Sequence, residues 1–430
     1  RKQLIIISLA LPVIASYLLY STTGFVILYF AGHLSSEADD PTIFAGISMA
    51  NMFANVSCFS ILIGMTSSVE TLGSQNNGAR NFREVGLVLQ RSVFVLSLML
   101  VPIAIIWLYA EQLFLALGTD RGICVVMGRF LRVRMATMPV DVLFKSYEKY
   151  LCCLGLTKPA MYSQLAAIVG TAGLGWLFVR RYQGGYESLA WAFVISTYLS
   201  FACLFGFSYR HPAVQRTLQP LSMDALHNLK EFVVLGVPGM LMLCSEWWAY
   251  EALTLFASQI SPEAVASQTI VIQCASLAYM VPLGVSVSAT TVVGNALGGR
   301  DVPLAKELSR LSVCCGVLCE VMLSALILVF ADGFISLFSD DEQVLSICRR
   351  TVPILAVMTW VDGMSSILGG ITRGAGKQHL GAYANIPSFY LVALPLSWYL
   401  CFRTPLGVVG LILGISTGPL LVDVCLTYAI

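Results

Sequence analysis

Long apolar stretches separated by short polar loops make up almost the whole chain. Each stretch is about 20 residues or longer, which is the length that an α-helix needs to cross the hydrocarbon core of a bilayer. The loops between them are rich in Gly, Pro, Asp and Arg. The pattern predicts twelve membrane-spanning helices, at residues 8–32, 42–70, 84–109, 122–150, 159–181, 188–209, 230–258, 264–292, 303–331, 345–370, 379–402 and 406–430.

The composition agrees with that pattern. Of the 430 residues, 57% are hydrophobic and 11% are charged, which is far outside the range of soluble globular domains. The predicted fold class is therefore an all-α polytopic membrane protein. A net charge of +1 gives no reason to expect a nucleic acid partner. The thirteen cysteines include no CxxC pair, so we expect no disulfide framework and no metal site, and nothing in the sequence requires a cofactor.

Positively charged residues predict the orientation of the chain. With an even number of spans both termini lie on one side of the membrane, and that side takes 16 of the 25 Lys and Arg residues. Since these residues concentrate in cytosolic loops, we expect cytosolic termini. The protein is expected to be integral to the plasma membrane or to a vacuolar or other organelle membrane.

The chain contains an internal repeat. GARNFREVGLVLQRS from Gly78 matches GGRDVPLAKELSRLS from Gly298, and CLGLTKPAMYSQ from Cys153 matches GAGKQHLGAYAN from Gly374, at nearly the same offset. The starts of the two halves also align, Ala10 with Gly236. Because each half has an even number of spans, we predict two six-helix lobes of the same orientation related by pseudo-two-fold symmetry. They are an N-terminal lobe 1–210, a cytosolic linker 211–229 and a C-terminal lobe 230–430.

Two parallel lobes are typical of secondary transporters, in which the substrate binds between the lobes and one lobe rocks against the other. A channel or a scramblase could share the twelve spans and the duplication, but a transporter is the expected class. The sequence has no HExxH motif and no convincing catalytic dyad, so we do not expect an enzyme.

Acidic residues inside the predicted spans are the candidate functional positions. A carboxylate at the centre of a spanning helix costs about 2.5–3.5 kcal/mol on insertion scales, so each one needs a reason. The candidates are Asp141, Glu246, Glu251, Glu320 and Asp362, with Glu70 near the cytosolic end of its helix. When the halves are aligned, both glutamates of CSEWWAYEAL fall opposite uncharged residues, whereas Asp362 falls opposite Asp141. The second half is thus the richer in acids.

Glu246 and Glu251 cannot share one narrow face of a regular helix, because five residues leave them about 140° apart around its axis. Pro238, which has glycines on both sides, predicts a bend or an unwound turn in the same helix. We expect one glutamate to face a central cavity and the other to pack inside its own lobe.

Buried carboxyl groups suit proton coupling. Burial disfavours the ionised form, so such an acid can hold a proton near neutral pH and release it when its surroundings change. Once ionised it attracts a cation, so a proton and a cationic substrate compete for it, as an antiporter requires. The structural alternative is a neutral carboxyl hydrogen-bonded between helices, which is the simpler explanation for Glu320. For Asp141, the simpler explanation is an i to i+4 ion pair with Lys145, and the other is a second coupling or substrate acid.

Aromatic residues accompany the acids. Trp247, Trp248, Tyr250 and Tyr279 lie near them in the predicted helices, and aromatic rings often line cavities that bind cations. Each ring alone is better explained by core packing or by the membrane interface than by a binding site. Only the combination of rings and acids therefore points to a binding site.

Four stretches carry a resemblance to a known family: SVETLGSQNNGARNFREVGLVLQRS, LGVPGMLMLCSEWWAYE, YMVPLGVSVSATTVVGNALGG and GGITRGAGKQHLGAYANIPSFY. The chain resembles the multidrug and toxic compound extrusion (MATE) transporters, in their eukaryotic branch, over its whole length. The resemblance implies proton- and cation-binding roles for Glu246, Glu251 and Asp362. It also implies a cavity lined by Trp247, Tyr250, Tyr279 and Asn55. Gln273 stands where some animal members have a further acid.

The expected function is therefore a cation-coupled antiporter, driven by protons, that exports small organic compounds with a bias toward cations. A sodium-coupled antiporter of the same fold is one alternative. A flippase for lipid-linked headgroups is another, although it would favour a cationic cavity. We expect the protein to act in the bilayer as a monomer.

Overall fold

The computed structural model describes the chain except for residues 1, 32–40, 183, 337, 339–340 and 430. The described residues form helices joined by short loops, with no strand among them. In the described part of the chain, each of the twelve predicted spans coincides largely with helix.

The first half contains six spans, several of them built from more than one helical segment. Its helices are α1 (Lys2–Ala31), α2 (Pro41–Ala54), η1 (Asn55–Phe59), α3 (Ser60–Met65), α4 (Ser67–Gly78), α5 (Phe82–Leu108), α6 (Ala110–Ala116), α7 (Arg121–Arg134), η2 (Met135–Thr137), α8 (Met138–Cys153), α9 (Lys158–Gly175), η3 (Trp176–Arg181) and α10 (Tyr186–Tyr209). The short elements α11 (Pro212–Thr217) and η4 (Met223–Leu226) follow.

The second half contains the other six spans, of which the first four are single long helices. Its helices are α12 (Leu229–Ala257), α13 (Pro262–Gly298), α14 (Val302–Ile335), α15 (Glu342–Gly374), α16 (Gln378–Ile386), η5 (Pro387–Ala393), α17 (Leu394–Phe402), α18 (Val408–Ile415) and α19 (Thr417–Ala429). Pro238 lies inside α12, which continues through it as an α-helix, so the alternative of an unwound turn at this proline is wrong.

Eleven helical stretches in the described part of the chain are long and apolar enough to cross a membrane. The fourth predicted span, made of α7, η2 and α8, is not one of them. It carries several charged side chains, including Arg134, Asp141, Lys145 and Lys149, which are buried within the protein. Apolar side chains on the outer face of other spans are exposed instead, for example Leu318, Met322, Val329 and Phe330 on α14, as expected of a surface that faces lipid.

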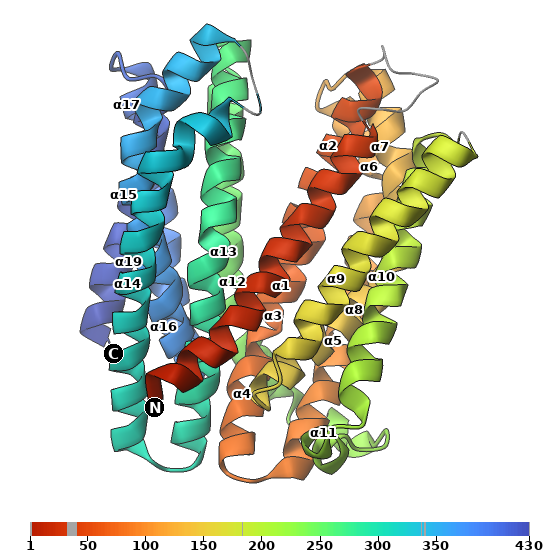
Figure 1. Cartoon of the computed structure of the whole chain (residues 1–430), viewed down its shortest axis with the longest axis vertical. Helices are drawn as coiled ribbons and strands as arrows, with labels where there is room; N and C mark the ends of the chain where they lie inside the picture. The colour runs from red at the N-terminus through yellow and green to blue at the C-terminus, as the bar shows by residue number, and fades with distance from the viewer. Residues whose placement is uncertain (1, 32–40, 183, 337, 339–340, 430) are drawn as a thin grey trace.

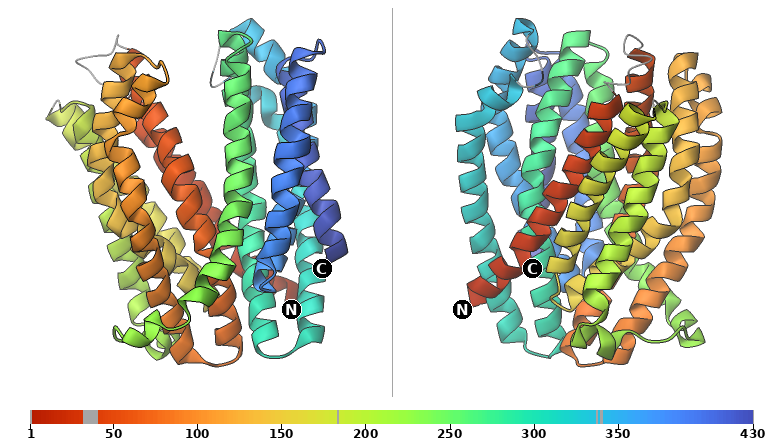
Figure 2. Two further views of the ribbon diagram at one scale, coloured as in Figure 1. Left: turned by 180° about the vertical axis from the view of Figure 1, so that it is seen from behind. Right: turned by 45° about the vertical axis from the view of Figure 1, so that its right-hand side comes forward.

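The helices form two bundles that lie close together at one end and diverge toward the other (Figures 1 and 2). Each bundle has its own hydrophobic core. One core consists of residues between 27 and 232, and the other of residues between 249 and 426 together with Ala10. We call the bundles the N lobe and the C lobe, and the end where they meet the closed end.

Helix α1 crosses from one lobe to the other (Figure 1). Its beginning packs on α13 and α14, where the Ser288 hydroxyl donates a hydrogen bond to the Ile6 carbonyl over 3.0 Å. Its end packs on α9. The segment between the lobes lies against α5, where Arg91 donates hydrogen bonds to the carbonyls of Ala225 and His227.

The contacts between the lobes at the closed end occur in matching pairs, one from each copy of the sequence repeat. A Cβ on Gly78 would overlap the carbonyl of Asn295, and a Cβ on Gly298 would overlap the carbonyl of Gln75, which is the same contact in the other copy of the repeat. The Gln75 amide donates to the Gly374 carbonyl over 3.0 Å, and the Asn295 amide to the Cys153 carbonyl over 3.2 Å. The hairpin between α4 and α5 therefore meets its repeat, between α13 and α14, with pseudo-two-fold symmetry.

Backbone conformations repeat in the same way. Arg80 and Arg300 have φ of 59° and 60°, while Gly155 and Gly376 have φ of 75° and 73°. Residues with positive φ are uncommon outside glycine, so the matching arginines are a specific feature of the duplicated turns.

Candidate functional site

Two acids from different helices come together inside the C lobe. Asp362 on α15 and Glu246 on α12 are each 8% exposed, and their carboxyl groups lie within electrostatic range of each other. Tyr279 on α13 interacts with Glu246, and Tyr250 on α12 interacts with Asp362. The ring of Tyr250 also packs edge-on against Phe389, with centroids 6.4 Å apart.

The surroundings of this pair decide its chemistry. Two ionised carboxylates in one buried site repel each other, so the pair is most stable with at least one proton bound. Arg373, further along α15, is the cation that interacts with Glu246. The pair can therefore hold a proton, and after losing it can attract a cation.

Glu251 does not join this pair. It is half-buried on α12 and interacts with neither Asp362 nor Glu246. The separation of about 140° between the two glutamates explains why, because Glu246 alone turns toward α13 and α15. This arrangement is consistent with the prediction that the two glutamates face different surroundings.

The remaining predicted lining residues are spread over both lobes. Trp247 and Gln273 are half-buried on α12 and α13. Asn55 is exposed in η1 of the N lobe, beside Val56, whose carbonyl accepts a hydrogen bond from Trp248 over 3.2 Å. This bond links α12 to η1, so Asn55 lies where the two lobes come close to each other and not beside the acid pair.

Two further acids lie near Asp362. Glu320 on α14 and Asp423 on α19 both interact electrostatically with it. Glu320 was among the candidate acids predicted from the sequence, with a structural role as its simpler explanation, whereas Asp423 was not predicted, although it too is a carboxylate within an apolar span. Among the described residues, no three His, Cys, Asp or Glu side chains are arranged to hold a metal ion.

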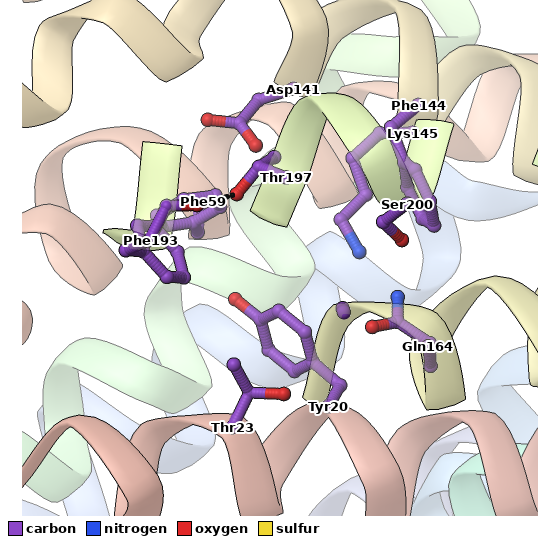
Figure 3. Close-up of a pocket in the computed structure, with 11 residues that line it drawn as sticks. Tyr20, Thr23, Phe59, Asp141, Phe144, Lys145, Gln164, Phe193, Thr197 and Ser200 are labelled. Atoms are coloured by element: carbon purple, nitrogen blue, oxygen red, sulfur yellow. Dashed lines mark hydrogen bonds between the residues drawn. The ribbon is translucent and has the colours of Figure 1, made fainter. Parts of the chain in front are cut away.

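A separate cavity lies inside the N lobe (Figure 3). Tyr20 and Thr23 approach it from α1, Asp141 and Lys145 from α8, and Gln164 from α9 (Figure 3). About 40 Å³ is open to the centres of water molecules, which at roughly 10–15 Å³ each is room for a few of them. The cavity therefore combines a largely apolar wall with a few polar and charged groups, and is too small as it stands for a large organic molecule.

Asp141 has a different partner from the one expected. The Thr137 hydroxyl donates a hydrogen bond to it over 2.6 Å, whereas Lys145 forms an ion pair with Glu148 over 3.4 Å. The simple ion pair between Asp141 and Lys145 is thus wrong. The Lys145 amine also lies 4.9 Å from the centre of the Tyr20 ring, as a cation–π interaction.

Glu70 forms ion pairs with both lobes at the closed end. Its carboxylate lies 2.6 Å from the Lys149 amine in the N lobe and 3.2 Å from Nε of Arg373 in the C lobe. The side chains of Glu70 and Lys149 are each 6% exposed and that of Arg373 is 14% exposed. Lys149 also donates to the Tyr17 hydroxyl over 3.2 Å.

These three charges break the symmetry of the closed end. The repeat places Thr290 opposite Glu70 and Gly370 opposite Lys149, and there the Thr290 hydroxyl donates to the Gly370 carbonyl over 2.8 Å. We call Glu70, Lys149 and Arg373 the charged triad. It joins the lobes on one side of the pseudo-two-fold axis, in addition to the symmetric contacts.

Comparison with known proteins identifies the same architecture. A family model described as MatE matches residues 12–177 and 238–399. The human multidrug and toxin extrusion protein 1 is 32% identical over 417 residues, which cover 97% of this chain and 72% of that protein. A fission yeast protein, the uncharacterized transporter C4B3.13 of Schizosaccharomyces pombe, is 29% identical over 423 residues, covering 98% of this chain and 78% of that protein.

Solved structures agree in fold. The crystal structure of the eukaryotic MATE transporter AtDTX14 superimposes with a TM-score of 0.93 at 23% identity, covering all of this chain and 95% of that one. A multidrug resistance MATE transporter in an outward-facing conformation superimposes with a TM-score of 0.86 at 19% identity, covering 98% and 94%. The predicted fold of twelve helices in two lobes is confirmed.

Proposed function

This chain belongs to the MATE family of multidrug and toxin extrusion transporters, and from that premise we propose that it exports organic compounds, with a bias toward cations, in exchange for protons. It is an integral membrane protein and not an enzyme. The observation that carries the proposal is the buried pair of Glu246 and Asp362.

Competition for one site provides the coupling. A proton on this pair removes the negative charge that attracts a cationic substrate, and loss of the proton restores it, so the two ligands exclude each other. A pH difference of one unit supplies about 1.4 kcal/mol and a membrane potential of 100 mV about 2.3 kcal/mol. For an uncharged substrate the two together suffice for a gradient of several hundredfold per proton. Exchange of one proton for one monovalent cation moves no net charge, so it draws on the pH difference alone, which corresponds to about tenfold.

Alternating access fits the contacts between the lobes. The lobes meet at the closed end through the symmetric hairpin contacts and the charged triad, and diverge toward the opposite end (Figure 1). By the positive-inside rule we expect the closed end and the termini in the cytosol, so this conformation would correspond to an outward-open state. Protons would enter, and substrate would leave, from that side.

Aromatic side chains supply the contacts for the substrate. Tyr279 and Tyr250 adjoin the acid pair, and Trp247, Gln273 and Asn55 extend the proposed lining toward the N lobe. Half-buried Glu251 would contribute a second negative charge away from the pair. The chain carries both lobes itself, which supports a monomer as the working unit.

The acids also bear on the alternatives. A flippase for lipid-linked headgroups would need cations to bind phosphate, whereas Asp362 is surrounded by other carboxyl groups. A sodium-coupled antiporter would use the same residues and the same fold, so only transport measurements separate it from a proton-coupled one.

The test is uptake of ethidium, a fluorescent organic cation, into proteoliposomes under an imposed pH gradient. We expect gradient-driven uptake by the unaltered protein and its loss in Glu246→Gln and Asp362→Asn. Glu307→Gln, which changes an exposed acid on α14 paired with Lys2, is the matched control and should transport normally. Transport independent of the gradient, or full activity in both acid variants, would remove the proposal. Sodium acting in place of the pH gradient would change the coupling ion.

A further inference from the structure

Two acids of the C lobe have no part in the exchange proposed above. Glu320 on α14 is fully buried, at 0% exposure, and neither of its carboxyl oxygens has a hydrogen-bond partner. One carboxyl oxygen of Asp423 on α19 is buried and also lacks a partner. Such groups are costly to retain in a membrane protein, so their presence requires an explanation.

The carboxyl group of Glu320 packs against a glycine of α15. A Cβ on Gly363 would overlap the carboxyl group of Glu320 in its present position, so the carboxyl packs directly against the backbone of α15 at this glycine. Gly363 directly follows Asp362, and Glu320 lies within electrostatic range of Asp362. The carboxyl group is therefore directed at the segment of α15 that carries the coupling acid.

Other ionisable groups that interact with Asp362 come from four neighbouring helices: Glu246 and Tyr250 on α12, Tyr279 on α13, Glu320 on α14 and Asp423 on α19. Cys319 interacts with Glu320, and Arg373, further along α15, is the cation that interacts with Glu246 and Tyr279. Arg373 does not contact Glu320 or Asp423 in an ion pair; its partner is Glu70.

The absence of a partner for both oxygens of Glu320, and for the buried oxygen of Asp423, bears on the chemical state of these acids. An ionised carboxylate without a hydrogen bond or a cation is very unfavourable in a buried position, whereas a protonated carboxyl is neutral and far cheaper to bury. A metal ion could also neutralise the charge, but no three acidic, histidine or cysteine side chains of the described residues are arranged to ligate one. Protonation is the state that fits this conformation, so release of these protons requires surroundings that change between the transport states.

We propose that Glu320 and Asp423 are additional proton-binding residues, which exchange protons with Asp362 during transport, so that the C lobe carries more than one proton for each substrate exported. The inference rests on the proposed function, because it extends proton coupling from the Glu246–Asp362 pair to the helices behind it. The protons move between carboxyl groups along α14, α15 and α19, and no bond other than O–H is made or broken.

The experiment counts protons released when substrate binds. Purified protein in detergent is mixed with ethidium in lightly buffered solution containing a pH indicator, and the protons released per ethidium bound are measured. We expect more than one for the unaltered protein, and a fall of up to about one in Glu320→Gln and again in Asp423→Asn, because each substitution removes one group from a coupled titration. Glu307→Gln, on the same helix as Glu320 but exposed, should leave the number unchanged.

The outcomes separate this inference from the proposed function. No proton release from the unaltered protein would contradict both. Release that is the same in Glu320→Gln and Asp423→Asn as in the unaltered protein would assign these acids a structural role alone and overturn only the inference. Both amides match their acids in size, and gel filtration checks folding. Should one variant fail to fold, the other lies on a different helix and carries the same test.

Discussion

The charged triad gives a prediction about the equilibrium between the two transport states. Replacing Arg373 by Gln removes the ion pair between Glu70 and the C lobe, while the hydrogen bond from Thr71 to the Arg373 carbonyl, 2.6 Å long, remains available. The lost ion pair exists only while the lobes are together at this end. The substitution should therefore favour the state in which the closed end has opened.

The size of the effect follows from burial and from the partners that remain. Removing one partner of a buried ion pair usually costs about 3–5 kcal/mol, because the other charge is left unpaired. Glu70 keeps Lys149 at 2.6 Å, and Arg373 is partly exposed at 14%, so we expect a smaller loss. A loss of about 2 kcal/mol corresponds to a shift of about 30-fold in the equilibrium.

Distances between spin labels measure this shift. The labels are placed at the exposed residues Arg121, the first residue of α7, and Gln259, between α12 and α13, in a background with the exposed Cys314 and Cys425 replaced by serine. These helix ends lie where the lobes diverge (Figure 1). Pulsed electron spin resonance should show a shorter distance gaining population in Arg373→Gln, as the open end closes.

The control removes a partner from an ion pair within one lobe. Glu84→Gln takes the acid from Arg91, which keeps its hydrogen bonds to the segment between the lobes. It should leave the distance distribution unchanged. The reasoning is refuted if Arg373→Gln shows the same distribution as the unaltered protein, or if Glu84→Gln shifts it as much.

Three further predictions concern single contacts. Gly78→Ala places a Cβ against the Asn295 carbonyl, so transport should fall by the equivalent of about 1–3 kcal/mol, whereas Gly206→Ala, where a Cβ meets nothing within 4 Å, should transport normally in the same uptake assay. Tyr279→Phe removes the hydroxyl that interacts with Glu246, which should lower the initial rate of ethidium uptake by the equivalent of about 1–3 kcal/mol; an unchanged rate would show that this hydroxyl is dispensable. Asp141→Asn keeps an oxygen that accepts from Thr137, so gradient-driven uptake should persist if coupling resides in the C lobe, and its complete loss would move a coupling acid into the N lobe.

The sequence predicted the features that depend on local pattern and on duplication. Apolar spans located the helices, because a helix that crosses a bilayer needs a continuous apolar length. The repeat predicted two lobes, and its pairing of Gly78 with Gly298 reappears in the matching contacts of these two glycines. Acids in apolar spans identified Glu246 and Asp362, whose proximity the structure then provided.

What the sequence left open depends on contacts between distant helices. The partners of Glu70 come from residues 149 and 373, and no spacing rule relates positions so far apart. Pro238 alone did not determine whether α12 unwinds. A helix that packs on several neighbours can continue through a proline, as α12 does. Asp423, like the other candidate acids, is a carboxylate within an apolar span. Its proximity to Asp362 depends on the packing of α19 against α15, which the sequence does not reveal.

The most direct test of the central claim reverses the direction of coupling. An outward gradient of ethidium, imposed on proteoliposomes without any initial pH difference, should drive protons in the opposite direction and create a pH difference across the membrane. The account predicts that this pH change occurs with the unaltered protein and is absent in Asp362→Asn. Ethidium that crosses through the unaltered protein with no accompanying pH change would contradict it.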